Sequence, residues 1–345
     1  MPIVSEARLR DLCLRIVLAM QAPQDIAEIV ADILVKADVK GVDSHGCRLL
    51  SLNYIHQLGN GMIVPAARPE VIRQDGATTI IEGHWGFGHA AARLAAGHAI
   101  ESARQYGIGT ASLVHVSHIA RLGEYAEQIA EQSMLGMVVC NANRAQTPYG
   151  GMERIFGTNP IALAVPRRGG KVLLSDFAMS GKSINKLKIA CQHEQSLAEG
   201  VILDKEGYPT TDPNDFFDGG VLLPAGGYKG YALTLFIDII GGILVGAGCA
   251  ALIDKYPGNG TLFIALDIAR WRPLDDFTSE LEELLTVVKN TQLAPGAEEI
   301  LLPGELESRA EDQRRRKGIP LDNETWQGLQ DTAAKLGLPA SLFAK

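Results

Sequence analysis

The stretch Thr78–Ala91, TTIIEGHWGFGHAA, passes from a β-like run into a helical one through a G-x-G-x-x-A match at its end. Such glycines open a Rossmann dinucleotide-binding unit when they follow a strand and an acidic residue comes about twenty positions later. Here the region upstream has helical patterns, and Glu101 follows Gly86 by only fifteen residues (101 − 86). We therefore favour a tight strand-to-helix turn, while a Rossmann turn stays an open alternative at this point.

The spacing of apolar residues along the sequence changes twice around this stretch. Helical spacing of apolar residues dominates the first seventy residues, short β-like runs then alternate with helical stretches, and helical patterns return near the C-terminus. We expect three internal helices, at residues 88–106, 121–132 and 228–250. The expected fold class is α+β, with residues 71–289 as a mixed-sheet domain. Residues 1–70 and 290–345 should join in one helical domain, because two short helical caps bury little surface separately.

Composition excludes several classes of protein. The 345 residues carry 32 basic and 40 acidic side chains, a formal net charge of −8, which disfavours binding to nucleic acid. The basic run Arg314–Lys317 reads as a solvated helix face. Five cysteines, none paired at metal-ligand spacing, predict a reducing compartment without disulfides and without a metal site. The N-terminus lacks a signal-peptide pattern, which favours a cytoplasmic protein.

The segment Tyr231–Ile253 is long and apolar enough to suggest a membrane span. Asp238 near its middle would cost roughly 2.5–3.5 kcal/mol in a bilayer, and the pair Gly241-Gly242 weakens it as an isolated helix. We therefore predict no membrane span, but a helix buried on all sides in the core.

The residues most suggestive of chemistry are Asp43, Ser44 and His45, which follow a helical stretch and precede a second glycine. A plain linker needs no imidazole at this place. His118 lies at a predicted strand-to-helix junction, where free backbone N–H groups can bind phosphate. Taken alone, it is more often a helix-start histidine without a catalytic role.

Several glycine-containing turns also carry polar residues. Thr158 lies in a Gly-Thr-Asn-Pro turn, and Asp176 ends a predicted strand, where it can accept from ribose hydroxyls or cap a turn. Lys229 in the first turn of a helix opposes the helix dipole unless an anion lies nearby. Lysine, histidine and acid beside such turns, without a metal cluster, fit an organic anionic cofactor better than a metal.

Six motifs occur in one order along the chain: DSHG, SHIARLGEYAEQ, FGTNPIALAVP, GYPTTDP, YKGYAL and LLPGE. In this set the chain resembles the type-2 malate/L-lactate dehydrogenase family of NAD(P)-dependent oxidoreductases, and its tail resembles the hydroxycarboxylate dehydrogenase branch. The resemblance implies a non-Rossmann NAD(P)-binding fold, a mixed-sheet domain with a helical domain built from both chain ends. It also implies a homodimer with the active site near the dimer interface.

The resemblance further implies roles for individual residues. His45 would donate and accept the proton, Ser44 would relay charge, and His118 would act as an acid/base or bind the cofactor. Substrate contacts would fall to Thr158 and to Arg48. The implied cofactor contacts are His118, Ile119, Ala120, Arg121, Leu122, Asp176, Phe177, Ala178, Tyr228, Lys229, Pro303, Gly304 and Glu305. The cofactor would be NAD or NADP, with NAD favoured.

Four positions depart from the family pattern. Leu49 stands where many members have a carboxylate-binding arginine, and Arg48 is one place early. Ile184 occupies a second substrate-side basic position, Tyr228 stands where histidine is frequent, and the cofactor turn around Phe177 reads DFAMS. The substrate carboxylate is therefore assigned to Arg48, to Arg121 or to a residue that the motifs do not identify.

The expected reaction is the interconversion of a 2-hydroxy acid and a 2-oxo acid, because an imidazole with a near-neutral pKa can exchange the hydroxyl proton. The alternatives are a catalytically silent nucleotide-binding homologue and an imino acid reductase of the same family. A hydrolase with Ser44 and His45 is disfavoured, since adjacent side chains on an extended segment point apart and no nucleophile elbow is present.

Overall fold

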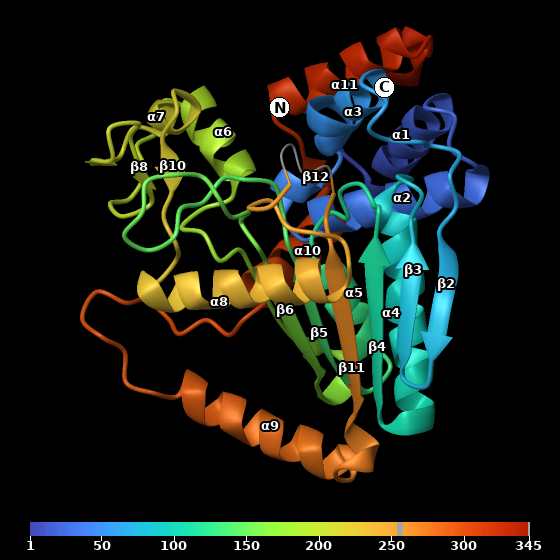
Figure 1. Cartoon of the computed structure of the whole chain (residues 1–345), viewed down its shortest axis with the longest axis vertical. Helices are drawn as coiled ribbons and strands as arrows, with labels where there is room; N and C mark the ends of the chain where they lie inside the picture. Colours follow the sequence, from blue (N-terminus) through green and yellow to red (C-terminus); the bar gives the residue numbers. More distant parts are fainter. Residues whose placement is uncertain (254–257, 344–345) are drawn as a thin grey trace.

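The computed structural model describes residues 1–253 and 258–343, and a mixed seven-stranded sheet forms its centre (Figure 1). The strand order is β2-β3-β4-β11-β5-β6-β7, and among these strands only β3 and β4 pair in parallel. The strands are β2 (Glu70–Asp75), β3 (Thr78–Glu82), β4 (Ile108–Val114), β5 (Met134–Cys140), β6 (Ile161–Pro166), β7 (Val172–Phe177) and β11 (Thr261–Asp267). The predicted mixed sheet is confirmed.

The glycine-rich turn joins β3 to α4 (Gly88–Tyr106), and Ser117 of the same chain occupies the space beside its glycines. The Ser117 hydroxyl accepts the N–H of Gly88 at 3.1 Å and donates to the carbonyl of Gly86 at 2.8 Å. A Cβ on Gly88 would lie 2.3 Å from the carbonyl oxygen of Ser117. The turn is therefore a close-packing device. The helical patterns expected in the first seventy residues are confirmed, but β2 and β3 directly precede the turn, and β3, α4 and β4 form one parallel βαβ crossover.

Two helices cover one face of the sheet, α4 and α5 (Gly123–Ala130). The face of α4 toward the sheet is alanine-rich, and Ala92, Ala95, Ala96 and Ala99 are fully buried. Small side chains let the helix approach so closely that a Cβ on Gly109 of β4 would lie 2.0 Å from the carbonyl oxygen of Ala99. This packing fixes the loop after β4, which carries His118.

The two ends of the chain share a second core (Figure 1). Leu9, Ile16 and Leu34 from the first helices belong to one buried cluster with Ile319 and Leu329 from the last part of the chain. The helices involved are α1 (Glu6–Ala19), α2 (Gln24–Val39), α3 (Ile55–Gly59) and α11 (Asn323–Lys335), with α10 (Glu305–Lys317) against α2 and a short β1–β12 pair (Ile3–Val4, Ile319–Pro320). The domain boundaries at residues 70 and 290 stay a prediction.

Residues 183–222 form a small lobe with a core of its own, which the sequence patterns did not predict. Leu187, Ile202, Phe216 and Leu222 are buried together there. Its elements are α6 (Ile184–Gln192), β8 (Ile202–Leu203), β9 (Pro209–Thr210), α7 (Pro213–Phe217) and β10 (Val221–Leu222). This lobe brings the start of α6 to the loop that carries His45, because Asn185 Nδ2 donates to the carbonyl oxygen of Ser44 at 2.9 Å.

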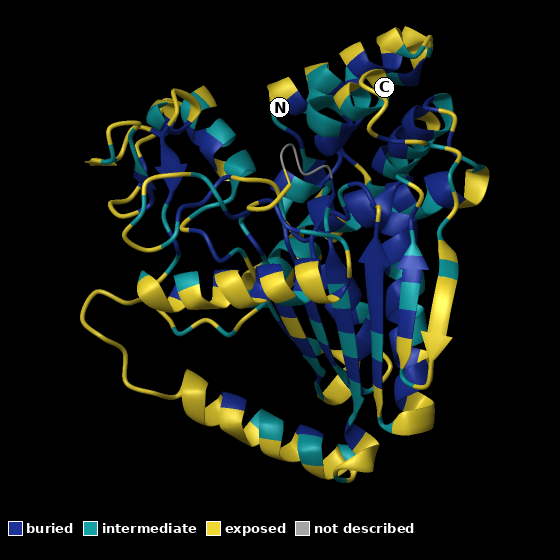
Figure 2. Cartoon of the chain, viewed as in Figure 1, coloured by how far each residue is buried: buried dark blue, intermediate teal, exposed yellow. Residues whose placement is uncertain are grey.

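The long apolar segment forms α8 (Tyr228–Asp238) and a π-helical turn (Ile239–Leu244), across the face of the sheet opposite α4 (Figure 1). The prediction that it is buried on all sides was wrong. Ile237 packs toward the sheet, but Phe236 is 60% and Leu244 69% exposed, and much of α8 and of α9 (Leu274–Lys289) faces outward (Figure 2). In the part of the chain that the structure describes, no helix has the length and apolar character needed to cross a bilayer.

Candidate active site

A short 3₁₀ turn, Asp43–His45, presents the catalytic candidates directly after α2. The buried carboxyl of Asp38 accepts the backbone N–H of Cys47 at 2.8 Å. A Cβ on Gly46 would lie 1.8 Å from Asp38 Oδ1, so only glycine fits between them. Arg314 of α10 donates to the Asp38 carbonyl and to the Asp43 carboxylate. Contacts with Asp38 on one side and Arg314 on the other therefore hold the turn in place without a ligand.

The side chains of Ser44 and His45 form a hydrogen bond, with 2.9 Å between Ser44 Oγ and His45 Nδ1. A serine hydroxyl can donate or accept, so this contact is compatible with either neutral tautomer of the imidazole. The sequence argument that adjacent side chains point apart does not hold here, because the segment is a 3₁₀ turn rather than an extended strand. The bond leaves Nε2 of His45 for a substrate.

His118 lies beside His45, with stacked rings whose centroids are 5.7 Å apart. Burial lowers the pKa of His45 to about 3, and the positive charges of His118, Arg121 and Lys186 act in the same direction. Burial lowers the pKa of His118 to about 4. Both imidazoles are therefore neutral at neutral pH in the protein without ligands, and each keeps one unprotonated ring nitrogen as a hydrogen-bond acceptor.

A polar cavity of about 480 Å³ adjoins this turn. Ser44, Arg121, Asp176 and Gly304 line it together with Lys186 of α6. The Asp176 carboxyl accepts the backbone N–H of Gly123 at 2.8 Å. Asp176 is open to the cavity, but partial desolvation there raises the pKa of its carboxyl, and Arg121 acts in the opposite direction. The cavity thus offers both acceptors and cations to a ligand.

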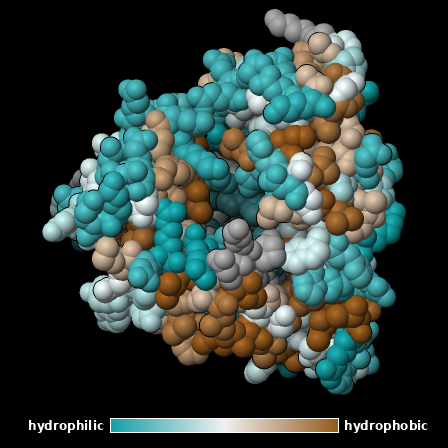
Figure 3. All heavy atoms as spheres, turned by 45° about the horizontal axis from the view of Figure 1, so that its top comes forward, coloured by the Kyte–Doolittle hydropathy of each residue, from teal (hydrophilic) through white to brown (hydrophobic). Residues whose placement is uncertain are grey.

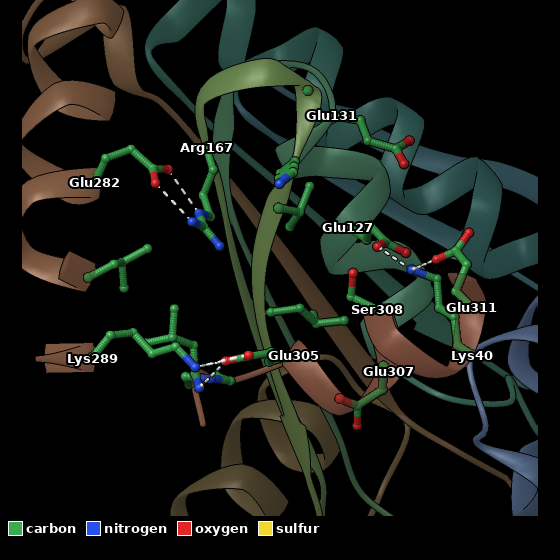
Figure 4. A pocket seen from close by; sticks show the side chains of 18 of the residues that line it. Lys40, Glu127, Glu131, Arg167, Glu282, Lys289, Glu305, Glu307, Ser308 and Glu311 are labelled. Atoms are coloured by element: carbon green, nitrogen blue, oxygen red, sulfur yellow. Dashed lines mark hydrogen bonds and ion pairs between the residues drawn. The ribbon is translucent and has the colours of Figure 1, made fainter. Parts of the chain in front are cut away.

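A second cavity, of about 820 Å³, continues from the first (Figure 4). Leu174, Pro303, Gly304 and Glu307 line both. The close-up shows its charged side chains in pairs, with Lys40 between Glu127 and Glu311, Arg167 on Glu282 and Lys289 on Glu305 (Figure 4). The space-filling view shows a hollow near the centre of one face, with hydrophilic side chains around part of its rim (Figure 3).

Glu305 uses its carboxylate within the chain rather than toward the cavity. It accepts the backbone N–H of Leu302 at 3.0 Å and pairs with Lys289 and Arg309. The backbone hydrogen bond, followed by the contact with Lys289, lowers its pKa to about 2. Its role in the loop before α10 is therefore to hold Pro303 and Gly304 at the boundary of the two cavities.

Most of the residues singled out by motif come together in the structure. The first cavity is lined by Ser44, Arg121, Asp176, Phe177, Pro303 and Gly304, and Glu305 lines the second. Ala178 directly follows this wall, and the carbonyl oxygen of Thr158 accepts the N–H of Met179 at 2.9 Å. The side chains of Ile119, Ala120 and Leu122 are at most 6% exposed and belong to the core, so only their backbone can meet a ligand.

His45 and His118 line neither cavity themselves and join this group through Ser44 and through their stacked rings, whereas three predicted residues lie apart from it. Arg48 is 4% exposed and its Nη1 lies 4.0 Å from Asp322 Oδ2, while its Nε has no hydrogen-bond partner among the described residues. Tyr228 and Lys229 are exposed at the start of α8 and line neither cavity, and the Tyr228 ring packs edge-on against Tyr149 at 6.2 Å. The motifs alone did not separate these residues from the others.

Sequence reasoning missed Asn185 and Lys186 at the start of α6, and also Tyr54 and His89 behind His118. The signal for the first pair is Ser183, whose hydroxyl caps α6 by accepting the N–H of Lys186. The cap places residues 185 and 186 in the first turn of a helix, beyond the position 184 that the family pattern singled out. No local pattern marks Tyr54 or His89, because their contacts depend on tertiary packing.

The mixed sheet differs from the parallel sheet of a Rossmann fold, and two polar cavities adjoin the turn that carries the Ser44–His45 pair. The chain belongs to the malate/L-lactate dehydrogenase family, whose model matches residues 4–330. A malate dehydrogenase of Pyrococcus abyssi is 33% identical over 97% of this chain and 95% of its own length. The confirmed family assignment means a nicotinamide cofactor, since dehydrogenases of this family use one.

Two solved structures extend the comparison. Sulfolactate dehydrogenase of Methanocaldococcus jannaschii superposes with a TM-score of 0.90 at 31% identity, and the match covers all of both chains. A delta1-piperideine-2-carboxylate reductase of Pseudomonas syringae superposes with a TM-score of 0.84 at 28% identity, covering 96% of this chain and all of the other. The fold therefore carries both hydroxy acid and imino acid chemistry in related proteins.

Proposed function

We propose that this chain interconverts a 2-hydroxy acid and a 2-oxo acid, with His45 as the group that takes and returns the proton. The single observation that supports this is the 2.9 Å contact between Ser44 Oγ and His45 Nδ1, at the edge of a polar cavity. The neutral imidazole accepts the hydroxyl proton of the substrate through Nε2. The Ser44 hydroxyl can rotate to suit both protonation states, so the pair serves both directions of the reaction.

The residues present fit a nicotinamide dinucleotide. The two connected cavities are long and polar, Asp176 can accept from ribose hydroxyls, and Arg121 lies beside it with an Nε that has no partner among the described residues. When bound, the nicotinamide ring takes up or gives the hydride. Pro303, Gly304 and Phe177 line the cavity in which the cofactor would lie.

We infer a preference for NAD over NADP. NADP carries one more phosphate, which needs cations that are not already neutralised. Among the cations of the larger cavity, Lys40, Arg167 and Lys289 are each paired with a glutamate, whereas Lys171 has no ion pair among the described residues. The paired cations favour hydroxyl groups over a further phosphate at most of that wall, and Lys171 is the cation that a further phosphate would meet.

We assign the substrate carboxylate to Lys186, with Arg121 as its neighbour, rather than to Arg48. Lys186 lines the smaller cavity, and its charge and that of Arg121 both act on His45. Arg48 is buried next to Asp322. A cation close to His45 would place the acid group of the substrate so that its C2 hydroxyl meets Nε2.

We also propose that a second copy of this chain covers the exposed apolar face of α8. Leu233, Phe236, Ile243 and Leu244 are each at least half exposed on this helix and the turn that follows it. An apolar surface of this kind marks a protein interface more often than free surface. A homodimer, which the sequence resemblance implies, would bury it.

The test is an assay of 2-oxo acids with NADH and with NADPH, followed by the absorbance of the reduced nicotinamide. We expect oxidation of NADH with at least one of pyruvate, oxaloacetate or sulfopyruvate. In His45→Gln, turnover should fall at least about a hundredfold while NADH fluorescence still reports binding. His56→Gln, an exposed histidine on α3, is the control that should keep wild-type turnover. Turnover of delta1-piperideine-2-carboxylate alone would replace this proposal with an imino acid reductase.

A further inference from the structure

The hydroxyl of Tyr54 contacts two histidines near the Asp43–His45 turn. Its hydroxyl oxygen lies 3.1 Å from Nδ1 of His118 and 3.2 Å from Nε2 of His89. Tyr54 and His89 are completely buried, and their rings meet edge to face with centroids 5.6 Å apart. The backbone N–H of Ala120 also donates to Nδ1 of His118, at 3.3 Å. Three side chains from three distant segments thus form one connected polar cluster.

The hydrogen-bond pattern allows one arrangement of protons in this cluster. The backbone N–H of Ala120 points at Nδ1 of His118 from 3.3 Å and favours an unprotonated nitrogen there, one whose single lone pair is shared with the closer Tyr54 hydroxyl. Burial raises the pKa of the Tyr54 phenol, so it keeps its single proton, and that proton must point at His118. The phenol oxygen is then an acceptor, and Nε2 of His89 must carry a hydrogen to donate to it.

The same arrangement explains an otherwise orphaned atom. Nδ1 of His89 is buried and has no hydrogen-bond partner among the described residues. In the arrangement above it is an unprotonated acceptor, which is less costly to bury unpaired than an N–H donor that has lost its partner. Burial lowers the pKa of His89 to about 3, so the ring does not take up a second proton at neutral pH.

We propose that Tyr54 and His89 are positioning residues that hold His118 in the tautomer with the proton on Nε2. His118 then presents a fixed N–H donor beside His45 and cannot act as a second base through that atom. The two neighbouring imidazoles divide the work: His45 exchanges the proton, and His118 donates a hydrogen bond to the oxygen or carboxylate of the substrate. The catalytic part of this statement rests on the proposed function, whereas the tautomer does not.

The test is NMR of the ring nitrogens in the full-length protein with isotope-labelled histidine, without cofactor or substrate. We expect His118 and His89 to show a protonated Nε2 and an unprotonated Nδ1 across neutral pH. Tyr54→Phe removes the hydroxyl and keeps the ring, so only the longer contact from Ala120 remains on Nδ1, and a measurable fraction of His118 should shift its proton to Nδ1. No shift would assign the tautomer to Ala120 rather than to Tyr54. Thr278→Val is the control: it also removes a buried hydroxyl, one that donates to the carbonyl of Asp275 on α9 at 3.2 Å, and should leave the His118 signals unchanged.

Kinetics supply a second measurement. A hydrogen bond of about 0.5–1.5 kcal/mol corresponds to roughly a two- to tenfold change, so kcat of Tyr54→Phe should fall about threefold to tenfold with little change in the Kd for NADH. His89→Leu should lower kcat in the same way, and His89→Gln, whose amide can still donate to Tyr54, should restore it. A wild-type His118 protonated on Nδ1 would overturn the inference. If the tautomer is as expected and no hydroxy acid or oxo acid reacts, the inference stands and the proposed function fails.

Discussion

The carboxylate of Asp38 occupies the space that a side chain on Gly46 would need, since a Cβ there would lie 1.8 Å from Asp38 Oδ1. The carboxyl also holds the N–H of Cys47, so it fixes the turn directly after His45. The position of Asp38 explains why a glycine follows His45. Glycine is needed for close packing inside the protein, rather than for the approach of a substrate.

Gly46→Ala should therefore disturb the turn Asp43–His45. The added methyl must displace either Asp38 or His45, and overpacking of this kind costs about 1–3 kcal/mol. We expect a lower melting temperature and a fall in kcat of at least about tenfold. Gly59→Ala, at a position with open space and without a positive φ, is the matched control and should change neither. Wild-type kcat in Gly46→Ala would show that the turn is not locked.

Stability should decline in acid because three histidines have a lowered pKa in the folded state. The pKa is about 3 for His45 and His89 and about 4 for His118, against about 6.5 in an unfolded chain. Below about pH 6.5 the unfolded chain takes up protons that the folded protein refuses, so the free energy of unfolding falls as pH falls. Burial raises the pKa of Asp38 to about 7, which acts in the opposite direction: its contribution is complete below about pH 4 and is lost as pH rises through 7.

Urea denaturation at a series of pH values checks this prediction. His89 is fully buried, and it should contribute a slope of about 1.4 kcal/mol per pH unit between about pH 6 and pH 4. His89→Gln cannot titrate, so its stability should depend on pH less steeply by that amount. An identical slope in the two proteins would mean that His89 is protonated in the folded state.

Lys186→Met should separate substrate binding from turnover. Loss of a charged hydrogen bond costs about 1.5–3 kcal/mol, which corresponds to a rise of roughly tenfold to a hundredfold in KM for the oxo acid. The Kd for NADH should change little. Lys188→Met, two positions along the same helix and outside both cavities, is the control. Equal KM values for the two variants would assign the carboxylate to another residue.

The sequence predicted local structure better than contacts between distant segments. The helix expected at 88–106 matches α4, because the glycine turn before it and Gly107 after it mark both ends. Hydropathy correctly singled out the segment that contains α8 but not its surroundings, since an apolar face looks the same whether a sheet or another molecule covers it. His45 and His118 are 73 positions apart (118 − 45), and no spacing rule predicts that their rings stack.

The same limit applies to the site residues, whose roles stay predictions. The motifs placed Arg48 at the substrate because it lies three residues after His45, but the chain turns after Gly46 and sends Arg48 toward Asp322. Lys186 was missed because its position depends on how the loop between β7 and α6 folds. Tyr54 and His89 carry no motif, and only the packing of α4 against the loop after β4 brings them to His118.

The exposed face of α8 leads to the last prediction, which concerns the assembly. Phe236 is 60% exposed on the outer side of a helix whose inner side packs on the sheet. If a second copy covers this face, a charge at position 236 would be buried without a partner, which costs several kcal/mol and should separate the subunits. We expect wild-type protein to sediment as a dimer and Phe236→Asp as a monomer.

Phe217 is equally apolar and 48% exposed on α7, so the control variant Phe217→Asp should leave the dimer intact. A monomeric wild-type protein, or a Phe236→Asp variant that still sediments as a dimer, would place the interface elsewhere or remove it. Loss of activity with the loss of the dimer would further show that the active site needs both copies.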